Sequence, residues 1–138
     1  MRGSLVFRQP PDNVFDAALD EPTWNPAMTS VEWLTPPPVG TGTRFRVLMG
    51  GRLPMMVELV EVDRPHRITT VTSSAMMTTD GSVTVVPRGV GTLLSWDWEY
   101  HLRGASRLLT PLFALAAGRW ERGNWVRMRE WMAAQPPR

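Results

Sequence analysis

The chain has 138 residues, no cysteine, two histidines and a formal net charge of only +2. The absence of thiols excludes disulfides and cysteine-ligated zinc or iron–sulfur sites, and two histidines argue against a histidine-based metal site. The small charge and the scattered arginines give no indication of a nucleic-acid partner.

The length fits a single domain, residues 1–138, which is large enough to bury its own core. The longest apolar run, residues 108–118, is too short to span a bilayer, and no secretory signal precedes the first strand. We therefore expect a cytoplasmic protein without stable membrane insertion, as a monomer or homodimer. Seven tryptophans and nine methionines supply large, adaptable apolar surface, which suits either a core of bulky residues or an aromatic ligand.

In chain order, residues 4–7 predict a short strand, and residues 10–28 predict two short helices. The first helix begins at a proline and an aspartate and places its apolar residues at helical spacing, and prolines restart the chain for the second. Alternating residue types then predict strands at 29–35 and 43–49, joined by the turn-rich "PPPVGTG".

Four further strands are predicted at 53–63, 66–74, 80–87 and 91–104. Their close spacing and hairpin-type turns indicate one antiparallel meander. The last of them has a period of two, which places its large residues on one buried face: Leu94, Trp96, Trp98, Tyr100 and Leu102.

After Gly104 the pattern changes to a long helix, at roughly residues 107–134. One apolar stripe recurs at spacings of three and four, and three leucines (108, 112 and 115) widen it in the first half; the stripe consists of Leu109, Phe113, Ala117, Trp120, Asn124, Met128 and Trp131. Pro111 either follows a Thr110 cap or kinks the helix. A curved sheet that packs its apolar face on this helix gives an α+β class.

The motifs "PPDNVFDAALDEPTWNP", "VGTGTRFRV", "VEVDRPHRI", "GVGTLLSWDWEY" and "GNWVRMREWM" extend over nearly the whole chain. With this order of elements, the chain resembles the helix-grip or START-like superfamily (SRPBCC), and most of all its polyketide cyclase/dehydrase group. The resemblance implies a seven-stranded curved antiparallel sheet around a long C-terminal helix, with two short helices between strands 1 and 2. It also implies an inner cavity for lipids, sterols, polyketides or aromatic molecules, but no single chemistry.

The candidate ligand-binding residues are those expected to face this cavity: Trp33, Phe45, Val47, Met49, Trp96, Trp98, Tyr100, Phe113, Trp120 and Asn124. Alternatively, the aromatic rings pack on the long helix and fill the space. The amide of Asn124, within the apolar stripe, needs a hydrogen-bond partner from a ligand or from a neighbouring strand.

Catalysis is left open, with Tyr100, Glu58 and Arg46 as candidates. A buried phenol needs a hydrogen-bond partner, an inward Glu58 would be a general base, and an inward arginine holds an enolate or carboxylate in cyclase-like relatives. Glu58 and Arg46 are equally compatible with solvent-facing strand positions. No phosphate loop, nucleophile elbow or metal-ligand cluster is present, so we expect no cofactor and no metal.

Two hypotheses remain for function. The first is a binding module that encloses a small hydrophobic or aromatic molecule, lipid- or polyketide-like, between the sheet and the C-terminal helix. The alternative is a polyketide cyclase/aromatase-type enzyme that acts in the same cavity. A third and weaker hypothesis is a module that acts on another protein.

Overall fold

The computed structural model describes residues 1–136, in which seven strands precede one long helix. The strands are β1 (Arg2–Phe7), β2 (Met28–Trp33), β3 (Arg44–Met49), β4 (Leu53–Asp63), β5 (Arg67–Ser73), β6 (Met77–Arg88) and β7 (Gly91–Leu102). The helices are α1 (Pro11–Leu19), α2 (Glu21–Trp24), the 3-10 helix η1 (Gly104–Leu109) and α3 (Thr110–Ala134).

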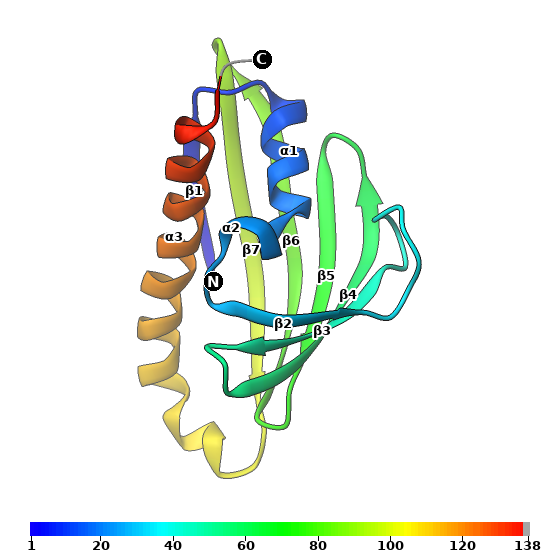
Figure 1. Ribbon diagram of the computed structural model, residues 1–138. Helices are drawn as coiled ribbons and strands as arrows, with labels where there is room; N and C mark the ends of the chain where they lie inside the picture. Colours follow the sequence, from blue (N-terminus) through cyan, green and yellow to red (C-terminus); the bar gives the residue numbers. More distant parts are fainter. Residues whose placement is uncertain (137–138) are drawn as a thin grey trace.

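All seven strands form one antiparallel sheet in the order β1-β7-β6-β5-β4-β3-β2. Strands β1 and β2 therefore lie at opposite edges, and α1 and α2 carry the chain from one edge to the other. The sheet is strongly curved, and α1, α2 and α3 lie on its inner side (Figure 1). This arrangement confirms the predicted α+β helix-grip fold.

A glycine in β6 shapes the middle of the sheet. Gly81 pairs with Trp98 of β7 and has a φ of 153°, which L-residues rarely adopt. A Cβ atom at this position would collide with the main-chain oxygen of Asp97 and lie 2.8 Å from the Trp98 ring. The missing side chain therefore makes room for the indole of Trp98.

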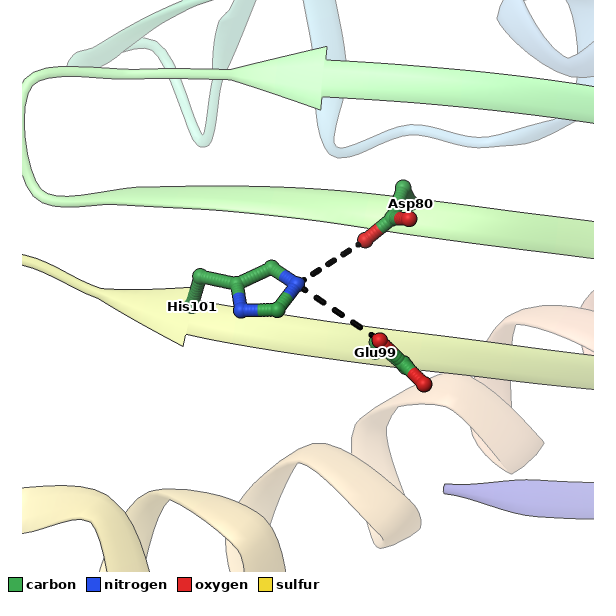
Figure 2. A group of neighbouring side chains, drawn as sticks. All are labelled: Asp80, Glu99 and His101. Atoms are coloured by element: carbon green, nitrogen blue, oxygen red, sulfur yellow. Dashed lines mark hydrogen bonds and ion pairs between the residues drawn. The ribbon is translucent and has the colours of Figure 1, made fainter.

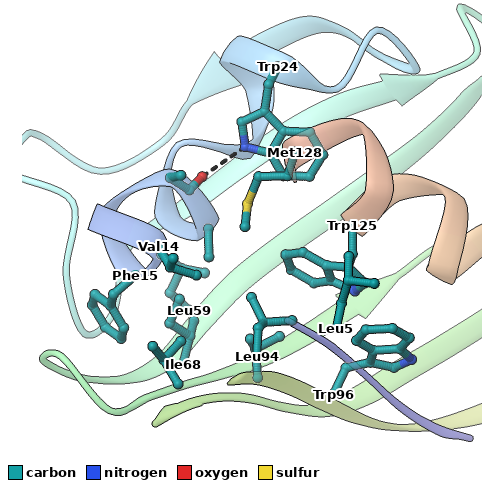
Figure 3. Packing of buried hydrophobic residues seen from close by; sticks show 14 of the residues in the cluster. Leu5, Val14, Phe15, Trp24, Leu59, Ile68, Leu94, Trp96, Trp125 and Met128 are labelled. Carbon is teal, nitrogen blue, oxygen red and sulfur yellow. Dashed lines mark hydrogen bonds between the residues drawn. The ribbon is translucent and has the colours of Figure 1, made fainter. Parts of the chain in front are cut away.

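A cluster of buried hydrophobic residues lies where α1, α2 and the second half of α3 meet the sheet (Figure 3). The Trp125 ring of α3 stacks on Trp96 of β7, with centroids 6.1 Å apart, and is tilted against Trp24 of α2 at 6.0 Å. The indole N–H of Trp24 donates to the carbonyl of Ala17 at 2.8 Å, so the buried polar atom is satisfied. These rings hold three elements together.

The start of the long helix differs from the prediction. Residues 107–109 belong to η1, and α3 begins at Thr110, with Pro111 in its first turn. A proline there removes no intrahelical hydrogen bond, so the helix continues without a kink at this residue.

The buried face of α3 also differs from the predicted stripe. It consists of Ala117, Glu121, Asn124, Trp125, Met128 and Met132. The four leucines of the predicted first half (108, 109, 112 and 115) are 56–86% exposed, so the described part of the chain leaves that face largely uncovered. Trp120 is 47% exposed, and Trp131 is half-buried. The prediction was wrong here because it followed apolar residues and passed over the charged Glu121.

Candidate functional site

A cavity of about 150 Å³ lies between the inner face of the sheet and the helices α2 and α3. Its wall is mainly apolar and includes four of the nine methionines, Met28, Met49, Met55 and Met77. Protein interiors are normally close-packed, and an apolar cavity of about this volume is known to hold one benzene molecule. The space therefore fits a single ring or the end of a longer molecule.

Few polar groups line the cavity. Its ionisable residues are Glu21 of α2, Tyr100 of β7 and Glu121 of α3. The neutral polar lining consists of Asn124 and three threonines, at positions 70, 72 and 79. Among the described residues, no arginine or histidine lines it. The cavity thus offers acids and neutral hydrogen-bonding groups but no cation.

Glu121 is the most unusual of these residues, because it is only 8% exposed and lies within the apolar face of α3. The indole N–H groups of Trp98 and Trp125 both donate to its Oε1 atom, at 2.8 and 3.0 Å. Its Oε2 atom accepts no hydrogen bond from the described residues, yet this atom is not completely enclosed by them. This second oxygen therefore keeps some accessible surface, in a residue that lines the cavity.

Two carboxyl groups, those of Glu21 and Glu121, line this cavity, and the pKa of each is shifted in favour of the protonated form. Burial raises the pKa of Glu121 to about 7; the charge of Glu21 adds to this effect, and the two indole hydrogen bonds oppose it. Burial also raises the pKa of Glu21, against a hydrogen bond of 3.1 Å donated by the Asn25 amide. One carboxyl group of the pair therefore exchanges its proton near neutral pH.

Tyr100 and Asn124 complete the polar lining. Burial, together with the charge of Glu121, raises the pKa of the Tyr100 phenol, so the hydroxyl stays protonated at neutral pH. Asn124 is 3% exposed, and its Oδ1 accepts from Arg127 at 3.1 Å. Its Nδ2 group donates to no described residue, although the side chain lines the cavity. Both side chains thus offer a hydrogen bond to a bound molecule.

Most of the predicted ligand-binding residues lie together around the cavity: Phe45, Val47, Met49, Trp98, Tyr100, Trp120 and Asn124. Trp120 lies at the mouth, since it lines the cavity and is also 47% exposed. Their role in binding stays a prediction.

The structure places three predicted residues outside the cavity. Trp96 faces the same side of β7 as Trp98, but Trp125 stacks over it and makes it part of the core. Trp33 lies at the end of the edge strand β2, 45% exposed, with its ring 4.9 Å from that of Phe45. Phe113 meets Tyr100 edge-to-face at 5.1 Å but does not line the cavity.

Two of the catalytic candidates also lie elsewhere. Glu58 alternates with the buried Val57 and Leu59, so its half-buried side chain lies on the outer face of β4. Arg46 is exposed on β3, with its guanidinium 3.9 Å from the Glu32 carboxylate. Neither side chain lines the cavity, whereas that of Tyr100 does.

The structure adds Glu21 and Glu121, which the sequence analysis did not select. Glu121 has a detectable signal, because it is four residues from both Ala117 and Trp125 and thus shares their face of the helix. Glu21 has no comparable signal, since α2 has only four residues and too short a pattern to orient its side chains.

A separate group of ionisable side chains lies on the outer face of the sheet (Figure 2). Nε2 of His101 is 3.1 Å from the Asp80 carboxylate and 3.7 Å from that of Glu99. His101 and Glu99 are exposed, and Asp80 is half-buried. The His101 ring thus contacts Asp80 on the neighbouring strand β6 and Glu99 on its own strand β7, and all three side chains keep contact with solvent.

Comparisons with known proteins identify relatives of the chain in sequence and in fold. The model of a family described as "Polyketide cyclase / dehydrase and lipid transport" matches residues 2–130. No curated protein matches the chain in sequence. Within residues 1–136, no helix is long and apolar enough to cross a membrane.

Solved structures show the same fold at low sequence identity. TTHA0849 from Thermus thermophilus has a TM-score of 0.75 at 19% identity and covers 98% of this chain and 99% of its own. Ara h 8.0201 has a TM-score of 0.74 at 13% identity, and the match covers 98% of this chain and 97% of that protein. A START superfamily protein from Mycobacterium smegmatis has a TM-score of 0.72 at 13% identity, and the match covers 95% of this chain and 97% of that protein.

Proposed function

Because the chain belongs to the polyketide cyclase/dehydrase and lipid transport family, we propose that it binds a small, mainly apolar molecule in the cavity between the sheet and α3. Membership of this family implies hydrophobic ligand binding in general. The observation that carries the proposal for this chain is the cavity itself, an apolar space next to the hydrophobic core. Its flexible methionine side chains adapt to the shape of a guest molecule.

A ligand panel tests this function. Single-ring aromatics, alkyl chains and sterols are titrated while tryptophan fluorescence is followed, because Trp98, Trp120 and Trp125 line the cavity. We expect a saturable change for compounds with an apolar part that fits about 150 Å³. Native mass spectrometry of the protein from its own host should show a retained small molecule. The proposal fails if no compound of the panel produces a saturable change.

A matched pair of variants separates cavity binding from adsorption to the surface. Val47→Phe puts a larger side chain into the cavity wall and should abolish binding, whereas Val86→Phe changes a residue that is 46% exposed and should not. Urea denaturation of both variants controls for overpacking, which costs about 1–3 kcal/mol in a filled core. Equal loss of binding in both variants would argue against the cavity as the binding site.

One observation favours a second function, an enzyme that moves protons in the same cavity. The Tyr100 hydroxyl and the Glu121 carboxyl line one space, and a carboxyl group with a pKa of about 7 suits general acid–base catalysis at neutral pH. A polyketide cyclase or aromatase needs such a donor and acceptor near its substrate. The outward position of Arg46 removes the arginine that would hold an enolate.

Tyr100→Phe distinguishes the two functions, because it removes only the hydroxyl group. A binding protein loses one hydrogen bond, worth about 0.5–1.5 kcal/mol, so affinity falls by roughly tenfold or less. An enzyme that uses the hydroxyl as an acid loses about 10²–10⁴ in turnover, with little change in affinity. The measurements are affinity and product formation with a poly-ketone substrate. If the wild-type protein forms no product from any poly-ketone that it binds, the enzyme hypothesis is discarded.

A further inference from the structure

Within residues 1–136, the two carboxyl groups of the cavity have no cationic partner. Glu21 comes from α2 and Glu121 from α3, and the charge of one raises the pKa of the other, so they lie within electrostatic reach. Of the groups that face them, Tyr100 on β7 is neutral and Asn25 is an amide. A buried carboxylate is normally paired with a cation, and without one the carboxyl group tends to keep its proton.

The cations nearest along the chain do not line the cavity. The guanidinium of Arg127 binds the oxygen of Asn124, and that of Arg122 reaches toward the carbonyl of Ser4 at 3.4 Å. The amino group of Met1 donates to the main-chain carbonyl of Trp98 at 2.7 Å. None of these three cations belongs to the cavity wall, so the acidic pair has no cation beside it among the described residues.

Two unpartnered atoms point to a ligand at this place. The Oε2 atom of Glu121 and the Nδ2 group of Asn124 have no hydrogen-bond partner among the described residues, although the two residues are only 8% and 3% exposed. Both residues line the cavity from successive turns of α3. The asparagine is an observation independent of the acidic pair, because it is neutral and bonds to neither glutamate.

Aromatic rings surround the same space. Trp98, Tyr100, Trp120 and Trp125 line the cavity together with the two glutamates. The face of an aromatic ring attracts a cation, and the attraction is strongest where water is excluded. An acidic pair within an aromatic wall is complementary to an ammonium group and repels a carboxylate.

We propose that the ligand is a protonated amine attached to a small apolar or aromatic group, with its nitrogen at Glu21 and Glu121 and its apolar part in the methionine-rich wall. This inference rests on the proposed binding function and narrows its ligand class. The ammonium donates to Oε2 of Glu121 and to the carboxylate of Glu21. A bound ammonium favours the ionised carboxylates, so binding releases a fraction of a proton near pH 7.

The test compares three probes with the same ring and chain length: 2-phenylethylamine, propylbenzene and 3-phenylpropanoate. Binding is followed by tryptophan fluorescence at pH 7.5, and calorimetry in two buffers of different ionisation enthalpy measures the proton released. We expect the amine to bind at least about tenfold more tightly than propylbenzene, which corresponds to about 1.4 kcal/mol. The carboxylate should bind more weakly than both.

Variants assign the preference to the carboxyl pair. Glu121→Gln keeps the size of the side chain and should reduce the preference for the amine to about threefold or less, together with the proton release. Glu130→Gln changes an exposed carboxylate of the same helix and should retain both. The inference is overturned if propylbenzene or the carboxylate binds as tightly as the amine, or if Glu121→Gln keeps the full preference.

The outcomes also separate this inference from the function on which it rests. If neutral compounds of the wider panel bind and the amine does not, the amine inference is wrong and the binding function stands. If no compound binds, whatever its charge, the binding function itself fails.

Discussion

Replacing Glu121 by glutamine removes a buried acid and keeps its shape. The side-chain oxygen of glutamine can still accept the N–H groups of Trp98 and Trp125, which lie 2.8 and 3.0 Å from Oε1 in the native chain. What disappears is the carboxyl proton and, at higher pH, the negative charge. The variant therefore isolates the electrostatic cost of burying this group.

The size of that cost follows from the pKa. Burial raises the pKa of Glu121 from 4.5 to about 7 in the folded protein. Between these values the folded state holds a proton that the unfolded state has lost, so the free energy of unfolding decreases as pH rises. At about 1.36 kcal/mol per pH unit, the wild-type protein should lose about 3 kcal/mol between pH 4.5 and pH 8. The raised pKa of Glu21 acts with the same sign.

Urea denaturation at pH 5, 6, 7 and 8 measures this loss. Glu121→Gln should lose much less stability over this range, and at pH 8 it should exceed the wild type by about 1–3 kcal/mol. Glu130→Gln, on the exposed side of α3, should follow the wild-type curve. If Glu121→Gln loses as much stability as the wild type between pH 5 and pH 8, Glu121 is not a buried acid with a raised pKa.

Two more predictions concern Trp98, which donates to Glu121, and Gly81, which packs against the Trp98 ring. Trp98→Phe removes one of the two indole donors, so the pKa of Glu121 should rise further and the pH-dependent loss of stability should move to higher pH in the same urea experiment. Gly81→Ala should destabilise the sheet by several kcal/mol, since the new methyl group meets the main chain at Asp97, whereas Gly89→Ala, in a turn with open space around it, should cost less than about 2 kcal/mol. A thermal melt of Gly81→Ala within a few degrees of the wild type would contradict this account of β6.

The sequence alone predicts the fold well because the information is local. Alternation in β7 places Trp96, Trp98 and Tyr100 on one face, and turn residues mark most strand ends. Which of these residues belong to the core and which line the cavity depends on contacts with residues distant in the sequence. Trp96 is core and Trp98 lines the cavity only because Trp125, on a distant helix, stacks over the former.

The acidic pair shows a different limit of sequence reasoning. Apolar periodicity selects hydrophobic residues for the buried face of a helix, so it passes over a glutamate in that stripe. Burial of Glu121 becomes intelligible only with the two indole donors, one of which is on β7. Glu21 depends on the placement of α2 against α3, which its four residues do not specify. Both side chains are positioned by tertiary contacts.

The chemistry of Glu121 discriminates between a structural role and a ligand-binding role. A leucine at this position would leave two buried indole N–H groups unpaired, so part of the role of Glu121 is to satisfy Trp98 and Trp125. A glutamine would satisfy the same donors without the cost of a buried charge. Only the carboxyl group adds a second oxygen that accepts, and at neutral pH it adds a charge or an exchangeable proton. Since Oε2 has no partner among the described residues and its side chain lines the cavity, we infer that these added properties act on a molecule bound there. Glu121 is a buried group that lowers stability at neutral pH and lines the cavity with one oxygen unpaired among the described residues, so we propose that it selects the ligand.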